Sequence, residues 1–176
     1  MAEDLDFSPI LADTLRLEGG RRVDSDGLTN NGIRQPIYDS YTKLKKLPQK
    51  SVDELNWGET SDFYKDEFYD KIKDLPTKNL KGVAFDFAVN AGTPTAVKGL
   101  QKIVGSKADG IIGKKTIAAV KKFIEKNGED FLVKSILQNR IDHNYAVIEN
   151  DPSKAQYERG WNNRIESQAK TYSNQE

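Results

Sequence analysis

The sequence has no cysteine and only one histidine. Without cysteine, a disulfide framework, a thiolate metal site and a cysteine nucleophile are all excluded. The histidine, His143, has no serine or cysteine setting in which it could act as the base of a catalytic triad, and we interpret it as an ordinary residue on a helix surface. Gly110 and Gly113 lack the strand and the Lys-Ser/Thr pair of a phosphate-binding loop. We therefore expect no metal and no cofactor.

Long apolar runs and a signal-peptide pattern are also missing. No apolar stretch approaches membrane-spanning length, so we expect no stable insertion into a membrane. Residues 1–6 lack the basic region and the hydrophobic region of a signal peptide. We therefore expect the protein to be made in the cytoplasm and to depend on another factor if it acts outside.

Net charge is absent too, because 27 basic residues balance 27 acidic ones, but the two signs are separated along the chain. Residues 51–74 carry eight acids against three lysines, and residues 96–126 carry eight lysines against two acids. The basic segment would suit an anionic polymer or simply form a solvated helix face, and the sequence leaves both open. Its only aromatic residue is Phe123, so a base-stacking platform is not indicated and we expect no nucleic-acid partner.

Helical periodicity is what the sequence has in abundance. Apolar residues recur at helical spacing over residues 10–17, 37–47, 62–75, 83–89, 96–104, 117–124 and 131–148, and a last helix follows Pro152. Strand signals are scarce outside residues 21–33, where Asp26-Gly27 and Asn31-Gly32 suggest a compact loop or a short hairpin. With 176 residues, 36% of them hydrophobic, the chain can bury a core. We predict a mainly α fold with one domain or two small lobes.

Local signals mark where some of these helices begin and end. Ser8-Pro9 and Thr93-Pro94 are typical of a cap followed by proline at the first helical position. Gly19-Gly20 should stop the first helix, and Ser51 with Glu54 three residues later suggests a capping box for a short turn.

Glu18 is the first candidate for chemistry. It stands at the end of the first predicted helix, and Asp24, Asp26 and Thr29 follow it in the polar loop. Glycoside hydrolysis needs such a set, in which one carboxylic acid protonates the leaving oxygen and a second carboxylate activates water or supports the oxocarbenium ion. Spacing alone also permits a surface glutamate before a glycine cap, with aspartates that only shape turns.

Two further constellations lie later in the chain. Asp86 and Asn90 are four residues apart on the apolar helix 83–89 and would either line a cleft or satisfy buried groups. Since an unpaired buried carboxylate is costly, we expect Asp86 to accept hydrogen bonds from backbone amides or a basic side chain, or to face the cleft. Residues 100–116 read as a helix, a glycine-shaped turn and a second helix. Trp161 is either a packing residue or a sugar platform.

These motifs, in this order, resemble glycoside hydrolase family 108, the N-acetylmuramidase-type lysozymes of phage endolysins and some bacterial wall-editing proteins. The resemblance covers nearly the whole chain. The segments that carry it are Leu17-Glu18-Gly19-Gly20, Asp24 with Thr29-Asn30-Asn31-Gly32-Ile33, Phe85-Asp86-Phe87-Ala88-Val89-Asn90-Ala91-Gly92, Leu100-Gln101 with Ala108-Asp109-Gly110-Ile111-Ile112-Gly113-Lys114-Lys115-Thr116, and Gly160-Trp161-Asn162-Asn163-Arg164. The fourth is similar to a peptidoglycan-binding region.

The resemblance implies a lysozyme-like, two-lobed helical fold with a small loop or hairpin region after the catalytic glutamate. It implies hydrolysis of the β-1,4 bond between N-acetylmuramic acid and N-acetylglucosamine, with Glu18 as general acid and Asp24 and Thr29 as its catalytic partners. The loop after Glu18 is shorter than in the family, so Asp26 could replace Asp24. The residues expected to bind substrate are Asp26, Asn30, Asp86, Asn90 and Trp161.

The same resemblance suggests an organisation and a biological setting. Residues 1–79 would form the catalytic lobe and residues 80–176 a helical lobe resembling a peptidoglycan-binding region, packed as one body. The partner would be the glycan strands of peptidoglycan, and the protein a monomer. A phage endolysin released by a holin would fit, as would a bacterial muramidase with a specialised export route. A lytic transglycosylase and a wall-binding module without catalysis stay as alternatives.

Overall fold

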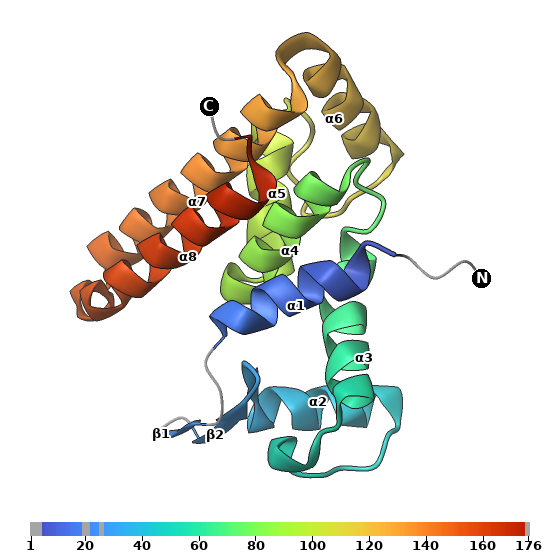
Figure 1. The fold of residues 1–176 in the computed structure, drawn as a ribbon, viewed down its shortest axis with the longest axis vertical. Helices are drawn as coiled ribbons and strands as arrows, with labels where there is room; N and C mark the ends of the chain where they lie inside the picture. The colour runs from blue at the N-terminus through green and yellow to red at the C-terminus, as the bar shows by residue number, and fades with distance from the viewer. Residues whose placement is uncertain (1–4, 19–21, 25–26, 175–176) are drawn as a thin grey trace. The chain divides into compact units, whose positions relative to one another are not determined.

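The computed structural model describes residues 5–18, 22–24 and 27–174, which fold into two compact units, Met1–Asp70 and Lys71–Glu176. Figure 1 labels their helices and strands. Helices account for most of both units, and the strands are confined to the first. The predicted mainly α class is therefore confirmed.

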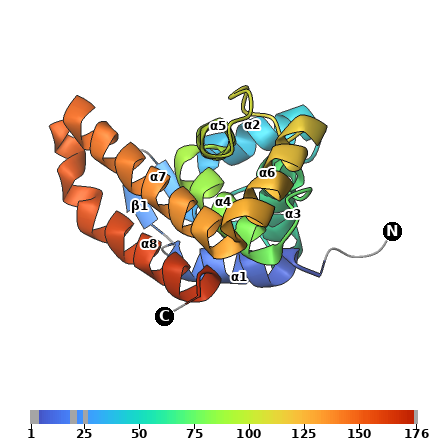
Figure 2. The same cartoon turned by 90° about the horizontal axis from the view of Figure 1, so that it is seen from above.

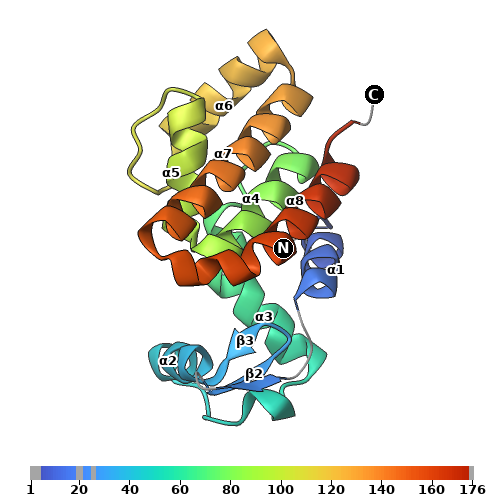
Figure 3. The same ribbon diagram turned by 90° about the vertical axis from the view of Figure 1, so that its left-hand side faces the viewer.

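The first unit contains three helices and a small antiparallel sheet. Its helices are α1 (Phe7–Leu17), α2 (Gln35–Lys45) and α3 (Trp57–Glu67), with the short 3-10 turns η1 (Val52–Glu54) and η2 (Tyr69–Lys71), which reaches the unit boundary. The strands β1 (Arg22–Asp24), β2 (Gly27–Asn30) and β3 (Ile33–Arg34) follow in that spatial order, each antiparallel to the next. Figure 3 shows β2 and β3 beside α2. The hairpin expected within residues 21–33 is present.

Aromatic side chains fill the core of this unit. Tyr41 meets Phe63 edge-on with ring centres 5.2 Å apart, and Phe63 meets Tyr64 in the same way at 5.5 Å. Phe7 of α1 packs against Tyr69 at 4.7 Å. Such pairs add to the burial of large apolar surfaces, so one aromatic cluster joins α2 to α3, and a separate pair joins α1 to η2.

The helix starts of the first unit differ from the sequence expectations. Helix α1 begins at Phe7 rather than at the Ser8-Pro9 pair. The capping box belongs to α3, where Asn56 and Glu59 each accept a hydrogen bond from the other's backbone N–H, at 2.9–3.0 Å. Ser51 caps η1 through the amide of Asp53, so the expected box with Glu54 is wrong. The proposed stop at Gly19-Gly20 lies outside the described residues.

The second unit contains five α-helices. These are α4 (Lys78–Ala91), α5 (Thr93–Ile103), α6 (Lys114–Asn127), α7 (Glu129–Asn150) and α8 (Glu158–Tyr172), and the 3-10 turn η3 (Pro152–Tyr157) joins the last two. Helices α5, α7 and α8 pack against α4. Figures 1 and 2 show α8 running alongside α7. Residues 82–88 are all buried, so the expectation of a central helix covered by its neighbours holds.

Two glycines let neighbouring helices approach closely in this unit. A Cβ atom on Gly82 of α4 would collide with the ring of Tyr172 on α8, and a Cβ on Gly99 of α5 would collide with the side chain of Asn139 on α7. Neither contact would be possible with a larger residue. Helix α4 is consequently in tight contact with the C-terminal helix.

Candidate active site

The turn between β2 and β3 supplies the backbone of the candidate site. Asn31 and Gly32 both have positive φ, at 47° and 76°, and Asn30 pairs with Ile33 across them. Two central residues with positive φ are the mark of a type I′ hairpin, for which Asn-Gly is the favoured sequence. The turn residues noted in the sequence therefore form the shape that their chemistry favours.

Glu18 brings its carboxylate to this turn. It is the residue that follows α1, its amide donates to the carbonyl of Thr14 at 3.1 Å, and its side chain is half-buried. A Cβ atom placed on Gly32 would lie 2.8 Å from Oε2 of Glu18. The carboxylate thus packs directly on the glycine, and no larger residue fits between them.

Tyr64 of α3 also contacts the Asn31-Gly32 turn. Its hydroxyl donates to the carbonyl of Asn31 at 2.8 Å, and a Cβ on Gly32 would lie 2.6 Å from that hydroxyl oxygen. The Tyr64 side chain is only 1% exposed and is fixed by contacts with Phe63 and Phe68. A rigid aromatic residue therefore holds the turn on which the Glu18 carboxylate lies.

Thr29 and Asn30 lie on β2, just before the turn, and both are half-buried. Thr29 pairs with Arg22 on one side and Arg34 on the other. The Asn30 amide donates to the carbonyl of Val52 at 3.0 Å, which ties the hairpin to η1. The structure thus brings Glu18 to the turn between β2 and β3, and Thr29 and Asn30 lie just before this turn on β2.

The candidates for the second carboxylate are Asp24 and Asp26. Asp24 is the last residue of β1 and its backbone pairs with Gly27, while its side chain is not described. Asp26 lies outside the described residues. Both stay candidates, as the sequence left them.

Asp86, which we expected among the substrate-binding residues, lies in the core of the second unit. It is 0% exposed. Arg140 donates to its Oδ2 at 2.6 Å, and Arg164 donates to Oδ1 at 2.8 Å and to Oδ2 at 2.9 Å. The expectation that a basic side chain would satisfy this carboxylate is confirmed, but substrate contact is not available to a buried group whose two oxygens are both occupied. That part of the expectation is corrected.

The electrostatics of this cluster keep Asp86 ionised. Burial acts to raise the pKa of the carboxyl group, but the hydrogen bonds and positive charges of Arg164 and Arg140 outweigh it and hold the pKa below its usual range. His143, next to Arg140 on the inner side of α7, is half-buried with its ring 5.9 Å from that of Phe87. Burial and the nearby Arg140 lower its pKa. It is not the plain surface histidine that we expected.

Asn90 and Trp161 remain accessible to different degrees. Asn90 is exposed in the last turn of α4, although Asp86 four residues earlier is buried. Trp161 is half-buried on α8, with its ring 6.0 Å from that of Tyr157. The two residues stay candidates for substrate contact.

Tyr64 was missed by the sequence reasoning, and Gly32 was noted only as part of a motif. The spacing of Tyr64 gives no signal, because it is one of several aromatic residues in α3. Gly32 does carry a signal, since glycine after asparagine favours the left-handed conformation found here. Its contact with Glu18 could not be read from the chain.

Metal-binding clusters and membrane-spanning helices are both absent from the part of the chain that the structure describes. No cluster of three or more histidine, aspartate or glutamate side chains there is arranged to hold a metal ion. None of its helices combines the length and the apolarity needed to cross a membrane.

Comparison with known proteins divides the chain at about residue 93. Residues 11–92 match the family described as "Glycosyl hydrolase 108", and residues 95–166 match the family described as "Predicted Peptidoglycan domain". The chain is similar to a solved structure of Brucella abortus SagA, with 26% identity, a TM-score of 0.75 and 96% of each chain covered. No curated protein matches. Glu18, the Asn31-Gly32 turn and Tyr64 all lie in the first matched segment.

Proposed function

From the match of residues 11–92 to the Glycosyl hydrolase 108 family, we propose that this chain is a muramidase of that family. The chain is a glycoside hydrolase with a lysozyme-like fold, and its substrate is peptidoglycan. The bond we assign to it is the β-1,4 bond between N-acetylmuramic acid and N-acetylglucosamine. We place catalysis in residues 1–79 and peptidoglycan binding in residues 80–176.

The observation that carries this proposal is the position of the Glu18 carboxylate on Gly32 and beside the hydroxyl of Tyr64. A general acid must hold its proton at one fixed point, within reach of the leaving oxygen. The backbone amide of Glu18 donates to Thr14 at the end of α1, and the Glu18 carboxylate packs against the Asn31-Gly32 turn. We assign it the proton transfer to the glycosidic oxygen.

Water activation then needs a second polar group, and we assign it to Asp24 together with Thr29, or to Asp26 in place of Asp24. If the enzyme inverts configuration, the Glu18 and Asp24 carboxyl groups should stand roughly 6.5–9.5 Å apart in the complex with substrate, whereas roughly 5 Å would indicate retention. Inversion is the course that we propose. Asn30, Asn90 and Trp161 are proposed contacts for the sugar chain.

Digestion of purified sacculi tests the assignment. The wild type should release fragments with reducing N-acetylmuramic acid ends, and Glu18→Gln should release none, because an amide cannot donate the acid proton. Glu54→Gln, which changes an exposed acid of the same unit, is the matched control and should behave as the wild type does. Comparable activity of Glu18→Gln and wild type would rule out the assignment.

The same digestion separates the two alternatives. A predominance of 1,6-anhydro ends would identify a lytic transglycosylase, whose substrate hydroxyl attacks in place of water. Binding to sacculi without any release would identify a wall-binding module without catalysis. Asp24→Asn and Asp26→Asn, assayed separately, should show which carboxylate activates water.

We also propose the role of a phage endolysin, made in the cytoplasm, released to the cell wall by a holin and active as a monomer without nucleic acid or inserted membrane segments. The match of both segments to families that act on or bind peptidoglycan motivates this role. Expression without a holin should leave host cells intact, and co-expression with a holin should lyse them. Lysis in the absence of the holin would contradict the proposed release.

A further inference from the structure

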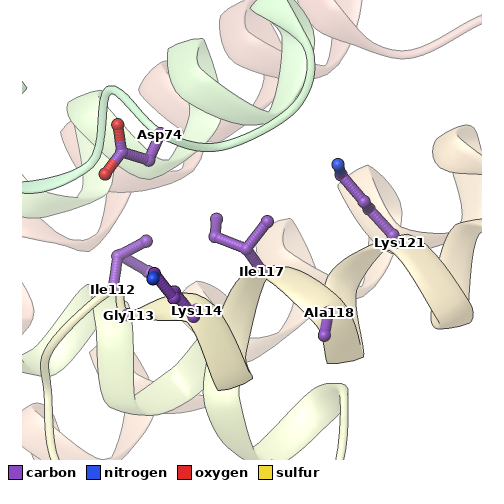
Figure 4. A pocket seen from close by; sticks show the side chains of 7 residues that line it. All are labelled: Asp74, Ile112, Gly113, Lys114, Ile117, Ala118 and Lys121. Carbon is purple, nitrogen blue, oxygen red and sulfur yellow. The ribbon is translucent and has the colours of Figure 1, made fainter.

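The second unit carries a groove at the start of α6 that the catalytic assignment leaves unused. Its volume is about 550 Å³, within the range of roughly 300–1,000 Å³ typical of small-molecule sites. Figure 4 shows Asp74, on the segment before α4, across the groove from the side chains of the α6 wall. The lining includes Ile112, Lys114, Ile117 and Lys121.

The groove has opposite charges on its two walls. Lys114, Ile117 and Lys121 are three and four residues apart, so they share one face of α6. Asp74 and both lysines are exposed, and none of the three has an ion-pair partner in the described part of the chain. Ile112 and Ile117 give the groove an apolar floor. An isolated basic patch would suit any anion, but this arrangement suits a ligand that carries both signs of charge.

The loop that forms one end of the groove is held in place by a buried side chain. Gln101 of α5 is 0% exposed. Its amide nitrogen donates to Oδ1 of Asp109 at 2.8 Å and to the carbonyl of Ile111 at 3.0 Å, and its oxygen accepts from the amide of Gly110 at 2.8 Å. The segment that leads into Ile112 and Lys114 is therefore preorganised, which lowers the entropic cost of binding.

The first turn of α6 adds a second feature that favours a carboxylate. Gly113 is its N-cap and also lines the groove, and no side chain caps the amides of the first turn. Free amides at a helix N-terminus attract negative charge. Lys114 and these amides form one binding wall for an anion, and Asp74 provides the wall for a cation.

We propose that this groove binds the stem peptide of peptidoglycan, with the free ammonium group of its diaminopimelate or lysine residue at Asp74 and a free carboxylate at Lys114, Lys121 and the α6 N-terminus. The inference rests on the proposed function, because it takes peptidoglycan as the substrate. It gives the groove of the second unit a definite ligand, the stem peptide. Anchoring the peptide would raise the local concentration of glycan at Glu18.

Calorimetric titration of the full chain with a soluble stem tetrapeptide containing diaminopimelate tests the inference. The wild type should bind the peptide saturably. Asp74→Asn and the double variant Lys114→Gln, Lys121→Gln should each weaken binding about tenfold, which corresponds to about 1.4 kcal/mol. Lys115→Gln, an exposed lysine of α6 outside the lining, is the matched control and should bind as the wild type does.

A modified peptide identifies the orientation. Acetylation of the diaminopimelate amine should weaken binding to the wild type about tenfold and cause no further loss in Asp74→Asn, because both changes remove one contact. Equal binding of the free and the acetylated peptide would overturn the inference, since it would show general attraction for negative charge. Unchanged binding by Asp74→Asn or by the double lysine variant would overturn it as well.

Failure of the inference can be told apart from failure of the proposed function. Release of reducing ends from glycan strands stripped of their peptides, without any binding of the tetrapeptide, would overturn the inference and leave the function standing. Binding of the tetrapeptide that depends on Asp74 and both lysines, without release of N-acetylmuramic acid ends, would support the peptide site and reject the muramidase assignment.

Discussion

Arg164 on α8 binds Asp86 on α4 through one edge of its guanidinium group, with Nη2 2.8 Å from Oδ1 and Nε 2.9 Å from Oδ2. The two residues are 78 positions apart in the sequence. Arg140 of α7 donates to the same carboxylate, so three helices of the second unit meet at one buried negative charge. Removing that charge would leave two buried guanidinium groups to face each other.

Asp86→Ala should lower the free energy of unfolding by about 3–5 kcal/mol, because breaking a buried ion pair by removal of one partner leaves an uncompensated charge. Denaturation by urea, followed by circular dichroism, measures the change. Glu149→Ala, which removes an exposed acid from α7, should change the free energy by no more than about 0.5 kcal/mol. A loss below about 1 kcal/mol in Asp86→Ala would contradict the structural role.

The pH dependence of stability should contain a contribution from His143. Burial and the positive charge of Arg140 lower its pKa in the folded state, so the unfolded chain takes up the proton first as the pH falls. The contribution is therefore complete above about pH 6.5, the ordinary value for histidine, and is lost as the pH falls through and below that value. Unfolding curves between pH 8 and pH 5 should show a steeper loss for wild type than for His143→Gln. Parallel curves would contradict the prediction.

Gly32→Ala should abolish most of the glycosidase activity. Its φ of 76° already disfavours alanine, and the added Cβ would displace the Glu18 carboxylate and the Tyr64 hydroxyl. Gly27→Ala is the matched control, because Gly27 also has positive φ, at 104°, and open space around its Cβ position. Both variants should lose about 1 kcal/mol of stability from backbone strain. Equal activity of the two variants in sacculus digestion would show that contact with Glu18 is unimportant.

Gln101→Leu should loosen the loop at residues 104–113. The substitution replaces the polar amide with an apolar side chain of similar size and leaves the backbone amide of Gly110 and the carboxylate of Asp109 without this partner. The expected cost is about 1–3 kcal/mol, and hydrogen exchange at the Gly110 amide should become much faster. In Gln138→Leu, where the changed side chain is exposed on α7, exchange at Gly110 should stay as it is in the wild type.

Local backbone conformation could be predicted from the sequence, whereas the side chains that contact each other across long sequence separations could not. The Asn31-Gly32 pair predicted a hairpin because its preferred backbone angles are intrinsic to those residues. The apolar surroundings of Asp86 required a partner for a buried charge, yet nothing in the spacing pointed to Arg140 or Arg164. Tyr64 was invisible for the same reason, since its contact with Asn31 joins positions 33 apart. Helix periodicity selects the buried face but does not select the neighbour that covers it.

The contacts of α8 with α4 also set an order of events during synthesis. Arg164 and Tyr172 are translated well after α4, yet one pairs with Asp86 and the other packs on Gly82. Until α8 has left the ribosome, Asp86 lacks its partner Arg164, and the surface of α4 around Gly82 is not covered by Tyr172. The first unit has all its own segments by residue 70 and can fold earlier, because domains fold as units as they emerge. The Glu18 unit therefore emerges from the ribosome first, and the unit that carries the groove can complete its core only after α8 has emerged.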